Sequence, residues 1–120
     1  MAFDTLDSLE SYGRGFAINA TEADLTGCEP LLAAPGAGKN IYLEKVVISC
    51  ATATNVTIGE GESSSAVENE IFGPIMFLAD GTTNIVVDFK RPIQLTANKA
   101  LTADAAGAGQ VTIFVEGFVK

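Results

Sequence analysis

The C-terminal stretch from Gln110 to Lys120 is the feature that most restricts what this chain can fold into. One set of alternate positions holds only β-branched apolar residues and a glycine: Val111, Ile113, Val115, Gly117 and Val119. The positions between them are mixed: Gln110, Thr112, Phe114, Glu116 and Phe118. Because side chains alternate across a strand, one face of this stretch is wholly apolar. β-Branched residues suit a pleated strand better than a helix. The pattern predicts a long antiparallel strand with one face on a core.

Asn40 to Cys50 is the second strong strand signal. Its apolar residues fall on both faces, and only Glu44 and Lys45 interrupt them. A strand that is apolar on both sides is central in its sheet or covered by a second layer. We therefore expect this segment to lie in the middle of a sheet or under a second layer.

Weaker strand signals recur along the rest of the chain, about every eight to twelve residues, with turn residues between them. They are Gly15–Ala20, Val56–Gly59, Ile71–Leu78, Asn84–Phe89, Ile93–Thr96 and Ala100–Thr102, and Leu31–Ala34 is a brief apolar segment among them. No segment after Gly13 has convincing helical periodicity. The pattern predicts an all-β chain, an antiparallel β-sandwich or barrel, and this many short strands favour a jelly-roll-like sandwich.

Other segments predict loops or interruptions. Thr21–Pro30 is polar and predicts a loop. Glu60–Glu70 holds four glutamates and three consecutive serines, which predicts a solvated loop with a brief strand near Val67. Proline has no amide hydrogen to donate, so Gly73-Pro74 marks an edge strand, a bulge or a bend. Arg91-Pro92 marks a boundary between two strands.

The N-terminal part differs from the rest. We divide the chain into an N-terminal arm with the first short strand, residues 1–30, and a β-sandwich domain, residues 31–120. Leu6, Leu9 and Tyr12 recur at a spacing of three, so the arm carries at most one short helix, over Asp4–Gly13. A helix this short needs a surface to dock on, either its own sandwich or a neighbouring subunit. A partly ordered arm fits the same residues equally well.

The charge balance excludes several classes of partner. The net charge is −8, with only seven lysines and arginines, which argues against nucleic acid and against an anionic membrane surface. Only 18% of the residues are charged, so a surface of small polar side chains can be buried against a partner at little desolvation cost. The first ten residues carry three acids and no base, which is unlike a secretory signal. We expect the protein either to stay in the cytoplasm where it is made or to leave it by lysis or assembly.

Residues for chemistry are scarce. The chain has no histidine, the commonest general base and metal ligand. The three serines Ser63–Ser65 have no base partner. The glutamates of the Glu60–Glu70 segment, Glu60, Glu62, Glu68 and Glu70, are a conceivable carboxylate pair for glycoside hydrolysis or a set of calcium ligands. The chain lacks tryptophan to hold a sugar and any calcium-loop motif. We predict no enzyme, no metal and no cofactor.

Two further motifs carry little chemistry. Gly38-Lys39 superficially matches a phosphate-binding loop, but Asn40 stands where the pattern needs Ser or Thr, and a strand follows instead of a helix. Cys28 and Cys50 are the only cysteines, and whether they pair stays open.

Two pairs of segments resemble a known family. The first is Leu31–Leu43 followed by Val46–Ser49, and the second is Pro92–Thr102 followed by Val111–Phe118. Their turn-and-strand arrangement is similar to the small jelly-roll head decoration (cement) proteins of tailed bacteriophages. The resemblance covers the chain from Leu31 onward, and the tail and fibre domains of phages share the same patterns.

The resemblance implies a structural virion protein on the outer capsid surface. It implies a homotrimer that binds the major capsid protein and clamps neighbouring capsomers, with no catalytic residue to carry over. The arm before Leu31 lies outside the resemblance. We predict that its apolar residues contact the capsid or a neighbouring subunit: Phe3, Leu6, Leu9 and Tyr12.

Two other functions stay open at this point. One is a phage tail or fibre β-domain that binds a host carbohydrate or receptor, against which the lack of tryptophan counts. The other is a hydrolase built on the Glu60–Glu70 segment.

Overall fold

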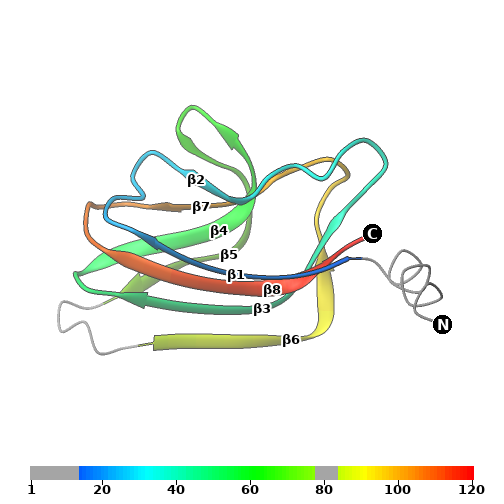
Figure 1. Ribbon diagram of the computed structural model, residues 1–120. Helices are drawn as coiled ribbons and strands as arrows, with labels where there is room; N and C mark the ends of the chain where they lie inside the picture. Colours follow the sequence, from blue (N-terminus) through cyan, green and yellow to red (C-terminus); the bar gives the residue numbers. More distant parts are fainter. Residues whose placement is uncertain (1–13, 78–83) are drawn as a thin grey trace.

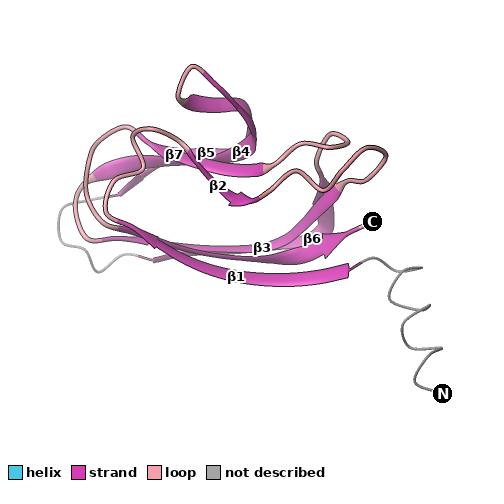
Figure 2. Ribbon diagram, turned by 45° about the horizontal axis from the view of Figure 1, so that its top comes forward, coloured by secondary structure: helices cyan, strands magenta, loops and turns pink. Residues whose placement is uncertain are grey.

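The computed structural model describes residues 14–77 and 84–120, and every regular element in them is a β-strand (Figures 1 and 2). The strands are β1 (Arg14–Glu22), β2 (Glu29–Leu32), β3 (Ile41–Cys50), β4 (Thr54–Ser63), β5 (Ala66–Phe77), β6 (Asn84–Gln94), β7 (Leu101–Ala105) and β8 (Val111–Val119). They form two four-stranded antiparallel sheets, ordered β1-β8-β3-β6 and β2-β7-β4-β5. The predicted antiparallel β-sandwich is confirmed. The described residues include no helix able to cross a membrane.

The strand order follows a simple nested rule. The first strand pairs with the last (β1 with β8), and then β2 pairs with β7, β3 with β6 and β4 with β5. The chain is thus one long hairpin that is wound into two layers. Further pairs, β3 with β8 and β4 with β7, join the windings into two sheets. This is the connectivity of a jelly roll.

The two strongest strand signals became the two central strands of one sheet. β8 lies between β1 and β3, and β3 lies between β8 and β6. Val111, Ile113 and Val115 are buried, as the alternation predicts. Gly117 completes this face because a Cβ there would collide with the carbonyl oxygen of Tyr42 and approach the ring of Phe16.

The core lies between the sheets and is apolar, with contributions from every strand. Every buried side-chain nitrogen or oxygen among the described residues has a hydrogen-bond partner. Two buried residues, Leu25 and Cys28, come from the segment Thr21–Pro30 that was predicted to be a polar loop. That prediction was wrong at both ends, since β1 runs on to Glu22 and β2 begins at Glu29. The carbonyl of Leu25 accepts the amide of Ala105, which holds the connection against β7.

The prediction over Glu60–Glu70 was right about a strand near Val67 and wrong about the loop around it. β4 and β5 continue as paired strands to Ser63 and Ala66, and only Ser64 and Ser65 form the turn. Both serines have positive φ, 53° and 64°, the backbone of a two-residue hairpin turn. Neither is glycine or asparagine, so the usual sequence signal for such a turn was missing.

Of the two predictions made from prolines, the one at Gly73-Pro74 is confirmed and the one at Arg91-Pro92 is wrong. Gly73-Pro74 lies in β5, an edge strand whose register against β4 shifts, as predicted. Arg91-Pro92 does not end a strand, because β6 runs on to Gln94. β6 is the edge of its sheet, and its pairing with β3 is irregular between Leu43 and Lys45, where the extra residues are accommodated. An edge position tolerates the missing proline amide.

Candidate interaction surface

The described residues contain no reactive cluster. No three acidic or cysteine side chains among residues 14–77 and 84–120 lie together in a way that would hold a metal ion. Cys28 and Cys50 are both buried free thiols, which answers the open question of their pairing. Burial raises the pKa of both thiols, and the carboxylates of Glu62 and Asp104 raise that of Cys28 further. A thiol with a raised pKa is a poor nucleophile at neutral pH.

Of the four glutamates in the Glu60–Glu70 segment, Glu60 is buried and 5% exposed, whereas the other three are exposed. Its carboxylate accepts the amide of Thr96 at 2.7 Å and the side-chain amide of Asn69 at 3.3 Å. Burial alone would raise the pKa of Glu60, but the hydroxyl and amide of Thr96, then Asn69 and the charge of Lys99, hold it below its ordinary value. Hydrogen bonds within the fold therefore keep Glu60 ionised in a buried position.

The end of the β4–β5 hairpin is fastened to the outer side of its own sheet. The amide of Val67 donates to the carboxylate of Asp104 on β7 at 2.7 Å, and Thr102 Oγ1 donates to the carbonyl of Gly61 at 2.8 Å. A Cβ on Gly59 would collide with the side chain of Val67, which shows how closely the hairpin folds back. Figure 1 shows this hairpin standing off the β2-β7-β4-β5 sheet. The outer side of that sheet is thus partly covered.

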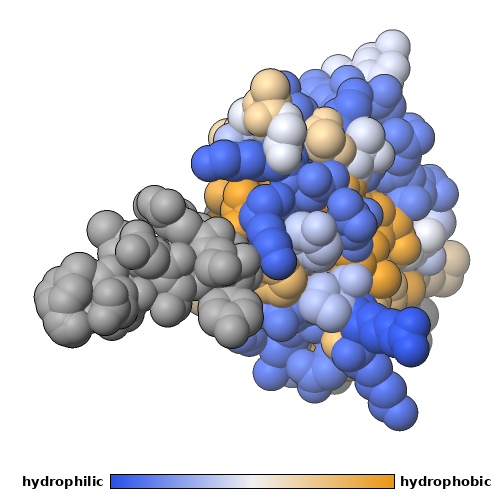
Figure 3. All heavy atoms as spheres, turned by 90° about the vertical axis from the view of Figure 1, so that its right-hand side faces the viewer, coloured by the Kyte–Doolittle hydropathy of each residue, from blue (hydrophilic) through white to orange (hydrophobic). Residues whose placement is uncertain are grey.

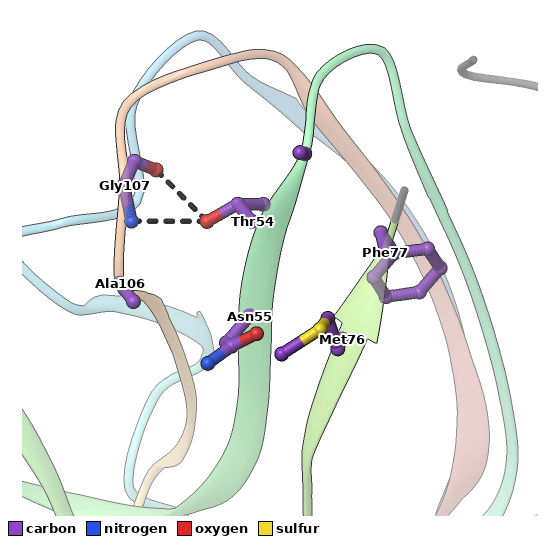
Figure 4. A pocket seen from close by; sticks show the side chains of 7 residues that line it. Thr54, Asn55, Met76, Phe77, Ala106 and Gly107 are labelled. Carbon is purple, nitrogen blue, oxygen red and sulfur yellow. Dashed lines mark hydrogen bonds between the residues drawn. The ribbon is translucent and has the colours of Figure 1, made fainter. Parts of the chain in front are cut away.

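A shallow cavity of about 380 Å³ lies at the opposite end of the same sheet. Figure 4 shows Met76 pointing toward Asn55, while Phe77 turns to the other side of the strand. Thr54 Oγ1 accepts the amide of Gly107 at 2.9 Å and closes the edge of the cavity. The lining is Ala53, Thr54, Asn55, Met76, Phe77, Ala106 and Gly107, which includes no acid, base or thiol. Such a cavity offers an apolar contact but no catalytic group.

The outer side of the β1-β8-β3-β6 sheet is open. No described segment crosses it in Figures 1 and 2. We call it the open face and define it by the outward side chains of the two central strands: Thr112, Phe114, Glu116 and Phe118 from β8, and Tyr42, Lys45, Val47 and Ser49 from β3. On the neighbouring strand β6, Val86 is 58% exposed.

The open face mixes three kinds of contact. Tyr42 and Phe118 stack with ring centroids 4.7 Å apart and planes 9° apart. Lys45 lies between Glu116 on β8 and Asp88 on β6, and its Nζ is 3.9 Å from the Asp88 carboxylate. Phe114 and Val47 are cross-strand neighbours at the centre. Aromatic and aliphatic groups with few charges are typical of the core of a protein interface.

The arm residues that were predicted to touch a partner, Phe3, Leu6, Leu9 and Tyr12, lie outside the described residues. The described chain begins at Arg14, which pairs with Val119 near the C-terminus. Figure 3 looks onto this end of the sandwich and shows mostly hydrophilic side chains with apolar ones between them. Sequence reasoning missed the open face as a site. The mixed alternate positions of the C-terminal strand were its signal.

The fold has a counterpart among solved structures. The chain matches a chain of the acidic stable capsid structure of Helicobacter pylori bacteriophage KHP30 with a TM-score of 0.52. The match covers 87% of this chain and 86% of the other, at 17% sequence identity. No protein-family model and no curated protein matches the sequence. At this identity the likeness is one of fold, so the chain is similar in fold to a chain from a bacteriophage capsid structure.

Proposed function

We propose that this protein is a structural component of a bacteriophage virion, a decoration protein that binds the outer surface of the capsid shell. One observation carries the proposal: the sandwich is similar in fold, over 87% of its length, to a chain from a phage capsid structure. The decoration role itself rests on the resemblance of the strand and turn segments to phage cement proteins. The major capsid protein is then the partner, and neither nucleic acid nor membrane is required.

The surface chemistry supports a role in contacts. The described residues offer no metal cluster and no activated thiol, and Glu60 is held ionised by its hydrogen bonds. A surface with few charges is buried at little cost, and many weak contacts that are repeated by capsid symmetry add up to strong binding. The resemblance to cement proteins also implies that three copies act together at each site.

We assign the N-terminal arm to the shell or to a neighbouring subunit. Its apolar residues Phe3, Leu6, Leu9 and Tyr12 alternate in the sequence with three acids, so the apolar and the acidic side chains can be changed separately. A contact through apolar side chains is insensitive to salt, whereas one through the acids weakens as salt rises.

The test adds the purified protein to phage shells that lack it and measures co-sedimentation and the melting temperature of the shell. The wild type is expected to bind to saturation and to raise the melting temperature. A variant with Phe3, Leu6, Leu9 and Tyr12 changed to Ser is expected to keep the sandwich, checked by circular dichroism, and to bind at least about tenfold more weakly.

A matched arm variant, with Asp4, Asp7 and Glu10 changed to the amides, separates apolar contacts from charge and is expected to bind like the wild type. Electron microscopy of the decorated shell then counts the copies at each site, with three expected. Wild-type protein that never adds to shells contradicts the decoration role.

A further inference from the structure

The open face is complementary to itself. β3 and β8 are the two central strands of its sheet, and from Lys45 to Cys50 they pair in unbroken register, beyond a shift between Leu43 and Lys45. Lys45 of β3 stands opposite Glu116 of β8, Val47 opposite Phe114, and Ser49 opposite Thr112. Each cross-strand pair thus joins a cation to an anion, an aliphatic group to an aromatic one, or two hydroxyls. A symmetry operation that exchanges β3 with β8 turns these neighbours within one chain into partners between two chains.

A two-fold axis that runs along the strands, midway between β3 and β8, is such an operation. When it places a second copy face to face with the first, β3 of each copy lies over β8 of the other. Lys45 then faces Glu116 of the second copy, Val47 faces its Phe114, and each contact occurs twice, as in any isologous interface. We propose that a second copy of this chain packs against the open face in this way.

The charges favour this occupant. Within one chain, Lys45 is paired with Asp88 at 3.9 Å, and the two side chains are 35% and 75% exposed. An exposed pair at that distance is weak, so Lys45 can also reach an anion on a facing copy. The net charge of −8 makes two copies repel one another in general. The attraction of Lys45 to an acid on the second copy opposes that repulsion at the centre of the face.

The size of the face also suits a dimer. Four strands about 4.8 Å apart and roughly nine residues long, at about 3.4 Å each, give a flat area on the order of 600 Å². A standard interface buries about 800 Å² of accessible surface on each side, and side chains add to the flat area. Two sheets that pack face to face cross at about 30°, so the paired contacts are best at the centre, where Lys45, Val47, Phe114 and Glu116 lie.

A charge exchange tests this geometry. Lys45→Glu gives a chain with acids at both central positions, and Glu116→Lys gives a chain with lysines at both. Each variant faces like charges in its own two-fold pair, whereas a mixed pair has two attractive contacts. The native mass of the wild type by light scattering is expected to be twice that of either variant, with a dissociation constant at least about tenfold tighter. Mixing the variants in equal amounts is expected to restore the doubled mass.

The mixing step separates an interface from a role inside the monomer, since no rearrangement within one chain depends on the other variant. Lys39→Glu and Glu70→Lys, at exposed positions outside the open face, serve as the control pair, and both are expected to keep the wild-type mass. Variants that retain the doubled mass, or a mixture that stays at the single mass, would overturn the proposal. A wild type that is monomeric would do the same and would leave the face to another partner. The inference does not depend on the virion role.

Discussion

At the scale of single residues, Glu60 joins three separate parts of the chain. It is buried on β4, and it accepts hydrogen bonds from the loop after β6, through Thr96, and from β5, through Asn69. A buried carboxylate is stable only when such donors replace water. The side chain of Glu60 therefore links β4 and β5 to the loop that follows β6.

The lowered pKa of Glu60 makes its contribution to stability depend on pH. The ordinary value is 4.5 and the folded value lies below it, so the carboxylate stabilises the fold fully above about pH 4.5. That contribution is lost as the pH falls through the folded pKa. Glu60→Gln is expected to lower the free energy of unfolding by about 1–3 kcal/mol at pH 7. The side chain of glutamine has only one oxygen, so its NH2 group then faces a donor, Asn69, in place of an acceptor.

The gap between wild type and Glu60→Gln is expected to shrink from pH 5 toward pH 3, as measured by urea unfolding at each pH. Glu62→Gln, at an exposed position in the same hairpin, is the control and is expected to change stability by less than about 0.5 kcal/mol. An equal gap at pH 3 and pH 7 would show that Glu60 is not the titrating group.

At the scale of elements, the β4–β5 hairpin shows how a strand can form where the local signal is poor. Val56–Gly59 and Ile71–Leu78 predict strands, but between them, from Glu60 to Glu70, acids alternate with small residues and leave no apolar face. The two strands nevertheless pair up to the turn at Ser64 and Ser65, and Val67 and Gly61 are bonded to β7. Contacts with a neighbouring strand here outweigh weak propensity.

The turn itself is suboptimal in its residue types. Both serines have positive φ, which favours asparagine and glycine. Ser64→Asn with Ser65→Gly is expected to raise the free energy of unfolding by about 0.5–1 kcal/mol, since both residues then suit the native backbone. Chemical unfolding measures the gain. The reverse pair, Ser64→Val with Ser65→Val, is expected to be destabilising, and a gain from it would contradict the turn geometry.

At the scale of the whole molecule, nested pairing brings the two ends of the described chain together. Arg14 pairs with Val119, and Thr21 and Thr112, which are 91 positions apart, meet through their hydroxyls at 3.2 Å. The sheets therefore depend on contacts between distant parts of the sequence. Folds of this kind form slowly, because long loops close before their contacts add stability.

The nested arrangement also predicts which circular permutants of the chain can fold. Joining Lys120 to Met1 and opening the chain between Ser64 and Ser65 is expected to leave the sandwich intact, because the new ends lie at an exposed turn that carries no core residue. Circular dichroism and a single cooperative unfolding transition are the measurements. Opening between Val47 and Ile48, in a central strand, is expected to abolish the fold. Two permutants with equal stability would contradict the architecture.

The sequence by itself determined the strands and their buried sides. Alternation of side chains is a local property of the extended backbone. Val111, Ile113 and Val115 therefore predict the buried side of their strand without any knowledge of the neighbouring strands. Apolar residues on both faces of Asn40–Cys50 indicated a strand that is central or covered by a second layer. The missing amide hydrogen of Pro74 indicated an edge, a bulge or a bend. The sequence also showed that the described chain has no histidine-based site, because the residue is absent.

Only the tertiary structure decided which distant residues meet. Leu25 and Glu60 lie in segments that are polar in sequence, yet both are buried, because β7 and the loop after β6 cover them. Lys45 and Glu116 became neighbours on the open face only once β3 had paired with β8. Periodicity states which side of a strand faces a core, whereas pairing and register between distant strands decide what lies beside it.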